Sequence, residues 1–305
     1  MTLIQKIKAR FFNEYWPLWK LPLKLHNLWS DRSYLEYIYR HKFKKKITLS
    51  RDNKDLVLYT EKIQWLKLYD RQPEYTDMVD KYNVCEYVSQ TIGKEYLIPI
   101  FGVWDKFTDI PFDTLPNQFV LKCTHDSGGN VICKDKDGLS IKKVEKYLTK
   151  RLARNFYWSS RQWAYKNIKP RILAQKFMVD ESGTGLKDYK IFCFGGEPKL
   201  VQVDIDRYGK DHRMNFYSTN WEFLQLMHYR PNAPSIIIQK PQCLELMLEL
   251  ARKLSADKIH VRVDFFIIKD KLYFGELTFY NYSGLIPFHP EEWDKKLGDW
   301  ICLPV

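Results

Sequence analysis

The chain has 305 residues, a formal net charge of +12 and a sequence pI of about 9.2. This length supports one large or two modest globular domains, and no apolar run is long enough to cross a membrane. The excess of positive charge favours an anionic partner, such as a nucleotide, an acidic glycan or a membrane surface. None of the six cysteines forms a C-x-x-C pair and no secretory signal opens the chain, so we expect a reducing, cytoplasmic protein without a zinc site.

Residues 1–50 are basic and rich in Trp, Tyr, Phe and Leu. Pro17 and Pro22 preclude one long amphipathic helix, so this stretch either packs on the main body as an arm or lies against a membrane surface. Helices are expected over residues 31–39 and 60–69. We therefore predict an N-terminal helical and basic segment over residues 1–75, with peripheral association at the inner face of a membrane as one of its roles.

A helix over residues 76–89 carries Lys81, and strand-like residues 96–103 follow. Next, residues 119–133 have the pattern strand, glycine-rich loop, strand, with Lys122 on the first strand and Gly128 and Gly129 in the loop. The pattern lacks the G-x-x-x-x-G-K-[ST] sequence of a Walker A loop. It is compatible with an ordinary tight turn and with a loop whose backbone N–H groups cover phosphates.

The middle of the chain alternates helix and strand signals. A basic helix is predicted over residues 141–155, strands over 171–178, 188–194 and 199–205, and an amphipathic helix over 242–254. Asp204 and Asp206 form a D-x-D pair, and strand alternation predicts that both carboxylates lie on one face.

Residues 259–284 contain two β-rich runs on either side of residues 269–271, which predicts a hairpin. With the turn centred on Asp270, Asp264 faces Glu276 and Arg262 faces Thr278 on one side of the hairpin. Two opposed carboxylates need a compensating cation, and Mg²⁺ bridging them to substrate phosphates meets that need. A surface ion network of Arg262 with the two carboxylates accounts for the pattern equally well.

Taken in order, these motifs resemble those of the ATP-grasp superfamily. Residues 60–305 look like the TupA-like ATP-grasp family of bacterial surface-polysaccharide loci, with the resemblance carried by residues 119–130, 188–198 and 274–284. The resemblance implies an α+β fold in which two α/β subdomains with mainly antiparallel sheets grip ATP. It implies an ATP-grasp domain over residues 76–305, with a mobile lid at about residues 118–178.

The resemblance also assigns roles to individual residues. It implies contacts to ATP from Lys81, Lys122, Ser127, Gly128, Gly129, Gln175, Lys176, Phe177, Met178, Asp188 and Arg213. It implies that Asp264, Glu276 and Thr278 hold Mg²⁺, that Arg262 and Lys122 act on the transferring phosphoryl group, and that Asn281, Ser283 and Gly284 contact the acceptor. One departure concerns Thr278, which stands where the superfamily pattern E-x-N has an asparagine, so Asn281 or a water is expected to complete the metal coordination.

The activity implied is that of an ATP-dependent carboxylate–amine ligase, which forms an amide through an acylphosphate. The family points to a uronic acid of a capsular or other surface polysaccharide, or its sugar-nucleotide precursor, with an amine or amino acid as second substrate and no nucleic-acid partner. Two alternatives stay open: a metal-dependent glycosyltransferase that uses the D-x-D pair, and a non-catalytic protein that binds anionic glycans.

Overall fold

The computed structural model describes residues 28–179, 187–207 and 211–304. Helices and antiparallel sheets are mixed along this part of the chain, which confirms the expected α+β class. The described α-helices are α2 (Asp31–Phe43), α3 (Tyr59–Tyr69), α4 (Glu74–Val79), α5 (Val84–Thr91), α6 (Ile141–Leu152), α7 (Tyr157–Ser160), α8 (Leu244–Ser255) and α9 (Glu291–Asp299).

The first sheet has four antiparallel strands in the order β1-β4-β2-β3. Its strands are β1 (Ile100–Trp104), β2 (Phe119–Cys123), β3 (Val131–Cys133) and β4 (Ile172–Lys176). Phe119, Leu121 and Cys123 point to one face of β2, where they pack with Val144 and Leu148 of α6 in a core of their own. Strand alternation therefore leaves the opposite face of this sheet for other partners.

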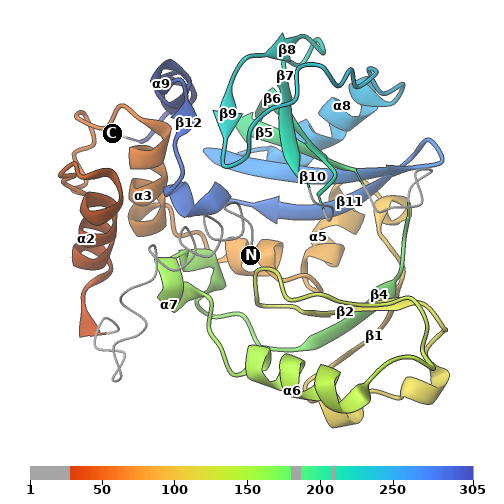
Figure 1. Cartoon of the computed structure of the whole chain (residues 1–305). Helices are drawn as coiled ribbons and strands as arrows, with labels where there is room; N and C mark the ends of the chain where they lie inside the picture. Colours follow the sequence, from red (N-terminus) through yellow and green to blue (C-terminus); the bar gives the residue numbers. More distant parts are fainter. Residues whose placement is uncertain (1–27, 180–186, 208–210, 305) are drawn as a thin grey trace.

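The second sheet has six antiparallel strands in the order β11-β10-β5-β6-β7-β8. They are β5 (Asp188–Phe194), β6 (Glu197–Ile205), β7 (Arg213–Tyr217), β8 (Phe223–Leu224), β10 (His260–Ile268) and β11 (Lys271–Thr278). Two short strands, β9 (Met227–His228) and β12 (Phe288–His289), pair separately. Figure 1 shows β11, the edge strand, on the side of this sheet that is turned toward β2 and β4.

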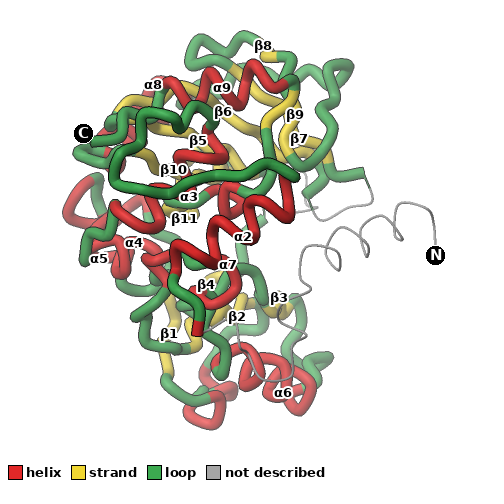
Figure 2. Tube along the Cα trace, turned by 90° about the vertical axis from the view of Figure 1, so that its left-hand side faces the viewer, coloured by secondary structure: helices red, strands yellow, loops and turns green. Residues whose placement is uncertain are grey.

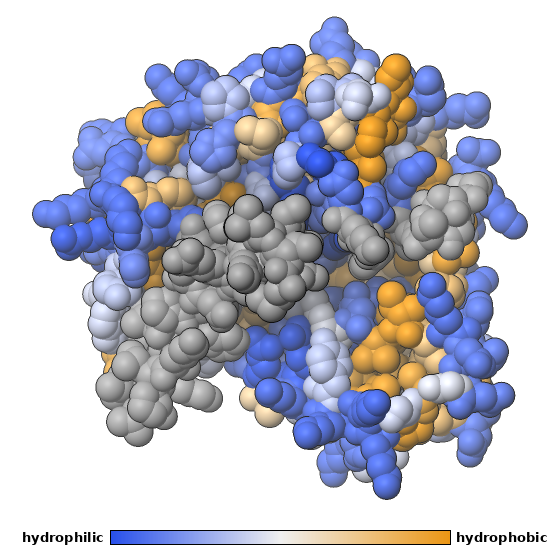
Figure 3. Space-filling model, viewed as in Figure 1, coloured by the Kyte–Doolittle hydropathy of each residue, from blue (hydrophilic) through white to orange (hydrophobic). Residues whose placement is uncertain are grey.

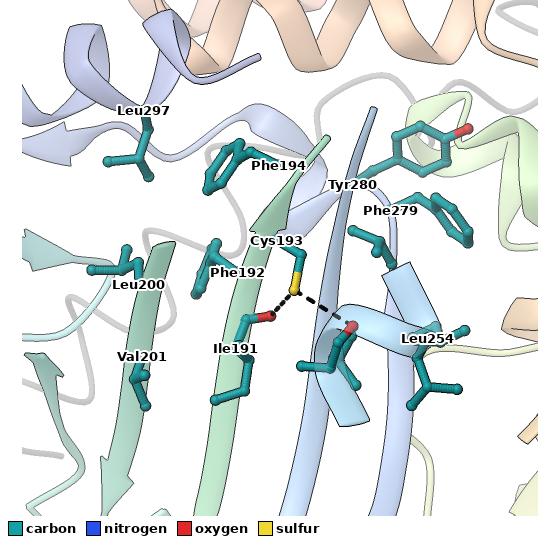
Figure 4. Packing of buried hydrophobic residues seen from close by; sticks show 14 of the residues in the cluster. Ile191, Phe192, Cys193, Phe194, Leu200, Val201, Leu254, Phe279, Tyr280 and Leu297 are labelled. Atoms are coloured by element: carbon teal, nitrogen blue, oxygen red, sulfur yellow. Dashed lines mark hydrogen bonds between the residues drawn. The ribbon is translucent and has the colours of Figure 1, made fainter. Parts of the chain in front are cut away.

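Each face of the six-stranded sheet has a different cover. Ile191 and Cys193 of β5 lie on the face covered by α8, and the Cys193 thiol lies 4.0 Å from the carbonyl oxygen of Ala251 (Figure 4). On the other face, Phe194 packs edge-on against Trp300 and stacks on His260, with ring centroids 5.3 and 4.6 Å apart. This aromatic packing ends farther along β5 at Lys190 and Asp188, where charged side chains replace it.

The two sheets lie one above the other, and α2, α3 and α7 lie on the side of the molecule that faces the viewer in Figure 2. On the face drawn in Figure 3, hydrophilic residues predominate, and apolar residues form smaller patches toward the upper right and the lower right of the view. Within the described ranges, no helix has the length and apolar character needed to span a membrane.

Most predicted elements are present, with two corrections. The helix expected over residues 76–89 is two helices, α4 and α5, separated by residues 80–83. The Asp80 side chain accepts hydrogen bonds from the backbone N–H groups of Tyr82 and Asn83, at 2.7 and 2.9 Å, so the carboxylate turns the chain and starts a new helix. The strand expected from residue 96 begins only at Ile100, and residues 94–96 form a 3₁₀ turn.

Of the predicted N-terminal segment, residues 28–75 are described, and they contain α2, α3 and the start of α4. Pro17, Pro22 and the tryptophans at 16 and 19 lie outside the described residues. The division at residue 75 and the lid at about 118–178 stay predictions, although the sheet that holds most of the lid begins earlier, at β1.

Candidate active site

The β10–β11 hairpin has the predicted pairing at its functional end. Asp264 lies opposite Glu276 and Arg262 lies opposite Thr278. The turn itself is shorter than expected: Ile268 pairs with Lys271, and Lys269 and Asp270 both have positive φ, so the turn has two residues. A bulge between Asp264 and Phe265 takes up the difference, because Gly275 adds a residue to β11 and restores the expected register.

Arg262 holds the two opposed carboxylates together. Its Nε and Nη2 atoms donate to the two oxygens of Asp264 at 2.6 and 2.7 Å, and Nη2 also donates to Glu276 Oε1 at 2.9 Å. Nη1 donates to Asn281 Oδ1 at 2.5 Å. The cation that faces the carboxylate pair is thus the Arg262 guanidinium, and three oxygen-bearing side chains converge on it.

The three ionisable groups of this cluster influence one another strongly. Burial opposes charge on Arg262, yet the carboxylates of Asp264 and Glu276 raise its pKa. Burial raises the pKa of Asp264 against the opposing effect of Arg262, which makes a second cation beside Asp264 favourable. Burial also acts to raise the pKa of Glu276, but Arg262 and Lys81 hold it below its usual value. The Glu276 side chain is 47% exposed, so it is the member of the pair that solvent reaches.

Lys190 extends the cluster across the sheet, and sequence analysis did not single it out. Glu276, Asp264, Lys190 and Gln202 are cross-strand neighbours in one row. The Lys190 ammonium lies 2.8 Å from Asp204, 3.2 Å from Asp188 and 3.8 Å from Asp264. The only sequence signal is the alternation that places Lys190 on the same face as Asp188.

The four-stranded sheet contributes a second group of side chains, from the face opposite α6. Lys122 donates to Gln175 Oε1 at 2.8 Å across the β2–β4 pair. Val120 shares this face and is paired with both Gln175 and Ile132, the latter 45% exposed. The face therefore presents a cation and an amide beside half-exposed apolar side chains, a surface suited to one end of a nucleotide.

The loop after β2 is held from both sides. Lys81 donates to the backbone oxygen of Asp126, and Arg151 of α6 pairs with the Asp126 carboxylate at 2.5 Å and donates to Ser127 O at 2.8 Å. Gly128 and Gly129 have φ of +73° and +79°, and a Cβ on Gly129 would lie 2.6 Å from Arg151 nitrogens. Glycine is favoured at both positions because of the left-handed backbone, and Arg151 would have to shift to admit a side chain at position 129.

The charges of the two sheets act on one another. Burial is the main reason why the pKa of Lys122 falls to about 8; repulsion from Lys81 lowers this pKa further, and attraction to Glu276 opposes the fall. Burial likewise lowers the pKa of Lys81, while Glu276 and Asp126 oppose that change. The predicted phosphate-binding lysines and the predicted metal-binding carboxylate are thus brought together between the sheets.

Sequence analysis missed two side chains near this centre, one arginine and one tyrosine. Arg207 forms an ion pair with Asp188 and influences the pKa of Lys122 and of Glu276. Tyr165, in the 3₁₀ turn η6 (Trp163–Tyr165), has its pKa raised mainly by burial and then by Glu276. No sequence pattern marks either residue, because both come from connections outside the strands.

Other predicted site residues lie at the edges of the cluster. Asp188 is buried and paired with Lys190 and Arg207, while Arg213 starts β7 and pairs with Asp211 at 2.7 Å. Lys176 ends β4, and its backbone N–H donates to Pro99 O; Phe177 and Met178 follow it as half-buried residues. Their roles toward ATP stay predictions.

The loop after β11 is η7 (Asn281–Gly284), and its residues have different surroundings. Asn281 is buried against Arg262, and its Nδ2 atom has no hydrogen-bond partner among the described residues. The Ser283 hydroxyl accepts from Gln162 at 3.1 Å and from Lys67 at 3.3 Å, and Ser283 O accepts from Lys67 at 2.7 Å. These contacts give Ser283 a structural role and make Asn281 the stronger candidate for contact with a ligand.

The D-x-D prediction is wrong about geometry. β6 ends at Ile205 and Asp206 has φ of +49°, so alternation does not extend to it. Asp204 is buried, and although burial alone would raise its pKa, His212 and Lys190 hold that pKa well below its usual value. Asp206 is exposed and accepts a hydrogen bond from the backbone of Asp211. The two carboxylates have separate structural partners.

The oxygen ligands fit Mg²⁺ without a large acidic cluster. The described part of the chain holds no group of three or more His, Cys, Asp and Glu residues arranged for a metal. Asp264, Glu276 and Asn281 nevertheless direct oxygens at one cation, Arg262, and Mg²⁺ commonly uses one or two carboxylates together with substrate phosphates.

Solved structures with partial similarity include the D-alanine–D-alanine ligase of Bacillus anthracis complexed with ATP (14% identity, 66% of this chain and 53% of that chain covered, TM-score 0.39). Another is the L-amino acid ligase of Bacillus licheniformis (14% identity, 86% and 56% covered, TM-score 0.44). This chain thus covers little more than half of either ligase, and the scores are too low for positions in the molecules to be equated. No curated protein matches the sequence significantly.

A family model gives the decisive result. The model described as TupA-like ATPgrasp matches residues 61–302, which include both sheets, the glycine-rich loop and the β10–β11 hairpin. The match covers well over half of the sequence and agrees with the resemblance carried by the motifs. This chain belongs to the TupA-like ATPgrasp family.

Proposed function

We propose that this protein is an ATP-dependent carboxylate–amine ligase. The observation that carries the proposal is the position of Lys81 and Lys122, which influence the same carboxylate, Glu276, that Arg262 joins to Asp264. Phosphoryl transfer depends mainly on alignment and charge neutralisation, and this arrangement supplies both. Membership of an ATP-grasp family supports the same conclusion.

Each group has a proposed task. Lys81 and Lys122 bind phosphates, and the Gly128–Gly129 loop covers them with backbone N–H groups. Gln175, Lys176, Phe177 and Met178 lie beside the adenine, and Asp188 approaches the ribose, while Ser127 and Arg213 add further contacts. Mg²⁺, held by Asp264 and Glu276 with Asn281 or Thr278, would neutralise phosphate charge. Arg262 remains beside the two carboxylates and faces the transferring phosphoryl group.

The reaction proposed has two steps. A substrate carboxylate oxygen attacks the γ-phosphorus of ATP, the bond to the bridging oxygen breaks, and ADP leaves. The amine nitrogen then attacks the acyl carbon, phosphate departs with the bonding electrons, and the nitrogen loses a proton. No protein nucleophile is needed, and the Nε2 atom of the His125 ring is engaged with the backbone oxygen of Arg154 at 3.0 Å.

For the substrate we propose a uronic acid of a capsular or other surface polysaccharide, or its nucleotide-linked precursor, joined to an amine or amino acid. The family resemblance and the net charge of +12 support this choice. A cytoplasmic location, at or near the inner face of a membrane, and a lid at residues 118–178 are proposed on the same basis. The separate partners of Asp204 and Asp206 count against a glycosyltransferase that uses them as a metal-binding pair.

The test is a product screen by mass spectrometry. The protein is incubated with ATP and Mg²⁺, with uronates that are free, nucleotide-linked or glycan-linked, and with a panel of amines. We expect a product whose mass is that of the two substrates less one water, with one ADP and one phosphate released for each. Release of a nucleoside diphosphate from a sugar donor in the absence of ATP would instead establish a glycosyltransferase.

A further inference from the structure

A pair of tyrosines lies beside the carboxylate cluster and is absent from the proposed machinery. β9 pairs with β12, with His228 opposite Phe288, and this pairing brings the chain after β9 close to the η7 loop (Figure 1). As a result, the rings of Tyr229 and Tyr282 lie 4.9 Å apart between centroids with an interplanar angle of 35°. Both side chains are only half buried.

Contacts of the His228 ring fix the position of the tyrosine pair. This buried ring stacks on Phe288 with centroids 4.1 Å apart, meets the Tyr282 ring edge-on, and bonds Ile286 O through Nε2 at 3.1 Å. Tyr229 and Tyr282 both have left-handed backbones, with φ of +59° and +43°. Non-glycine residues adopt this conformation at a free-energy cost, and such residues concentrate at binding sites.

Arg230 adds a charge to the pair. Its guanidinium lies over the Tyr229 ring, 4.5 Å from the centroid, and Nη2 donates to the Tyr229 hydroxyl at 3.3 Å. Its Nε atom is buried and has no hydrogen-bond partner among the described residues, and none of the ion pairs found there includes Arg230. Arg262, Arg207 and Arg151, by contrast, each pair with a carboxylate. Arg230 is therefore a half-buried cation that is able to bind an anionic group of a ligand.

The pair is directly connected to the candidate active site. Tyr282 follows Asn281, which accepts the hydrogen bond from Arg262. Burial raises the pKa of Tyr282 to about 12; Asp204 adds to this rise, and Arg262 and Lys190 oppose it, so the hydroxyl lies within the influence of the charged row. A ligand on the tyrosines is thus close to the groups that would activate it.

We propose that Tyr229, Tyr282 and Arg230 form the subsite for a carboxylated sugar, which rests on the proposed ligase function for the identity of the reaction. The tyrosines already contact each other, so a sugar ring packs on their outer faces through its C–H groups rather than between them. The planar guanidinium of Arg230 pairs with a carboxylate of the sugar in a two-pronged contact.

The experiment measures binding to the full chain without turnover. Trigalacturonate is the acidic probe, maltotriose the neutral one and glucose 6-phosphate the phosphorylated one, each followed by calorimetry and by saturation-transfer NMR. Arg230→Gln should lower the affinity for trigalacturonate about tenfold or more, because one charge-assisted contact is lost, and should leave the affinity for maltotriose unchanged. Tyr229→Asn removes the ring and is compatible with the left-handed backbone, and it should lower the affinity for both oligosaccharides. Arg252→Gln, on the exposed side of α8, is the matched control and should change neither.

The outcomes separate this subsite from the ligase proposal. Arg230-dependent binding of trigalacturonate with no ADP release for any amine would keep the subsite and remove the ligase. Amide formation with an unchanged uronate affinity in Arg230→Gln would keep the ligase and overturn the subsite. Equal or tighter Arg230-dependent binding of glucose 6-phosphate would also overturn it, because the ligand would then be a phosphate.

Discussion

Arg262 has two sets of contacts that assign it different tasks. The bidentate bond to Asp264 is structural, whereas the contact to Glu276 joins the buried guanidinium to the carboxylate that solvent reaches. A lysine keeps the charge there but loses the planar fork that spans two oxygens. The chemistry of a single side chain thus distinguishes an ion network from an active site.

We expect Arg262→Lys to bind Mg·ATP nearly normally and to lose turnover by about 10² or more, because contacts to a developing phosphoryl charge matter most in the transition state. Nucleotide affinity is measured by calorimetry and turnover by ADP release. Near-normal turnover would reduce the hairpin to a structural ion network.

Glu276→Gln should fail in a different way. It keeps the shape of the side chain and removes a negative charge that a metal needs, so nucleotide binding should become weaker and less dependent on Mg²⁺ concentration. The readout is the ADP dissociation constant over a Mg²⁺ titration. Thr278→Val removes the 3.1 Å hydrogen bond to Glu276 and one of the two alternative neutral metal ligands, but no negative charge, so it should have a smaller effect.

The lowered pKa of Lys122 predicts that nucleotide binding depends on pH. Burial lowers its pKa to about 8 in the free protein, so the ammonium is present below that pH and is lost above it. Bound phosphate raises the pKa again, so ATP affinity should fall by up to about tenfold per pH unit once the pH exceeds 8. Lys122→Arg stays charged and should flatten the profile between about pH 7 and 9. A wild-type affinity that is constant over this range would remove Lys122 from the phosphate site.

At the scale of elements, the pairing within the β10–β11 hairpin could be predicted from the sequence, although one cause of that pairing could not. The alternation of Arg262 and Asp264 on one run and of Glu276 and Thr278 on the other was enough to place them on one face. The pairing of Asp264 with Glu276 also required a bulge at Gly275, whose absent Cβ leaves room for Asp264 O at 3.1 Å. A bulge has no reliable sequence signal, so the turn was predicted one residue too long.

Contacts between elements distant in sequence could not be predicted. The Lys190 network depends on β5 lying between β10 and β6, an order that alternation within one strand does not reveal. The bonds from Lys67 and Gln162 to Ser283 join residues more than 100 positions apart. Local pattern identifies faces and turns, whereas sheet order and loop contacts arise only in the folded chain.

The packing of the η7 loop against α3 leads to a prediction about the stability of the fold. Gly284 has φ of +60°, and a Cβ there would lie 2.6 Å from Ile63 and 2.7 Å from Gln64 Nε2. Gly284→Ala should therefore destabilise the fold by about 2–4 kcal/mol, through backbone strain and overpacking together. Gly195→Ala is the matched control, since Gly195 has φ of +56° with no atom within 4 Å of an added Cβ, and should cost about 1 kcal/mol. Urea unfolding measures both, and equal losses would refute the packing argument.

At the scale of the molecule, the candidate site exists only because two sheets meet. The four-stranded sheet contributes Lys122 and the glycine-rich loop, and the six-stranded sheet contributes Asp264 and Glu276, while each sheet keeps a core of its own. Like charges of Lys81 and Lys122 on one side face the carboxylates on the other. An anionic ligand with an attached cation satisfies both sides at once.

This arrangement predicts that Mg²⁺ with a non-hydrolysable ATP analogue stabilises the whole protein. At about 100 times its dissociation constant a ligand adds about 2.7 kcal/mol to the free energy of unfolding, so the melting temperature should rise by several degrees. Because both sheets hold the ligand, Lys122→Ala and Asp264→Asn should each reduce the rise, measured against each variant's own unliganded melting temperature. Lys199→Ala removes an exposed charge on β6 away from the cluster and should leave the rise intact. If one of the first two variants keeps the full rise, the nucleotide is held by a single sheet, and the site between the two sheets is wrongly drawn.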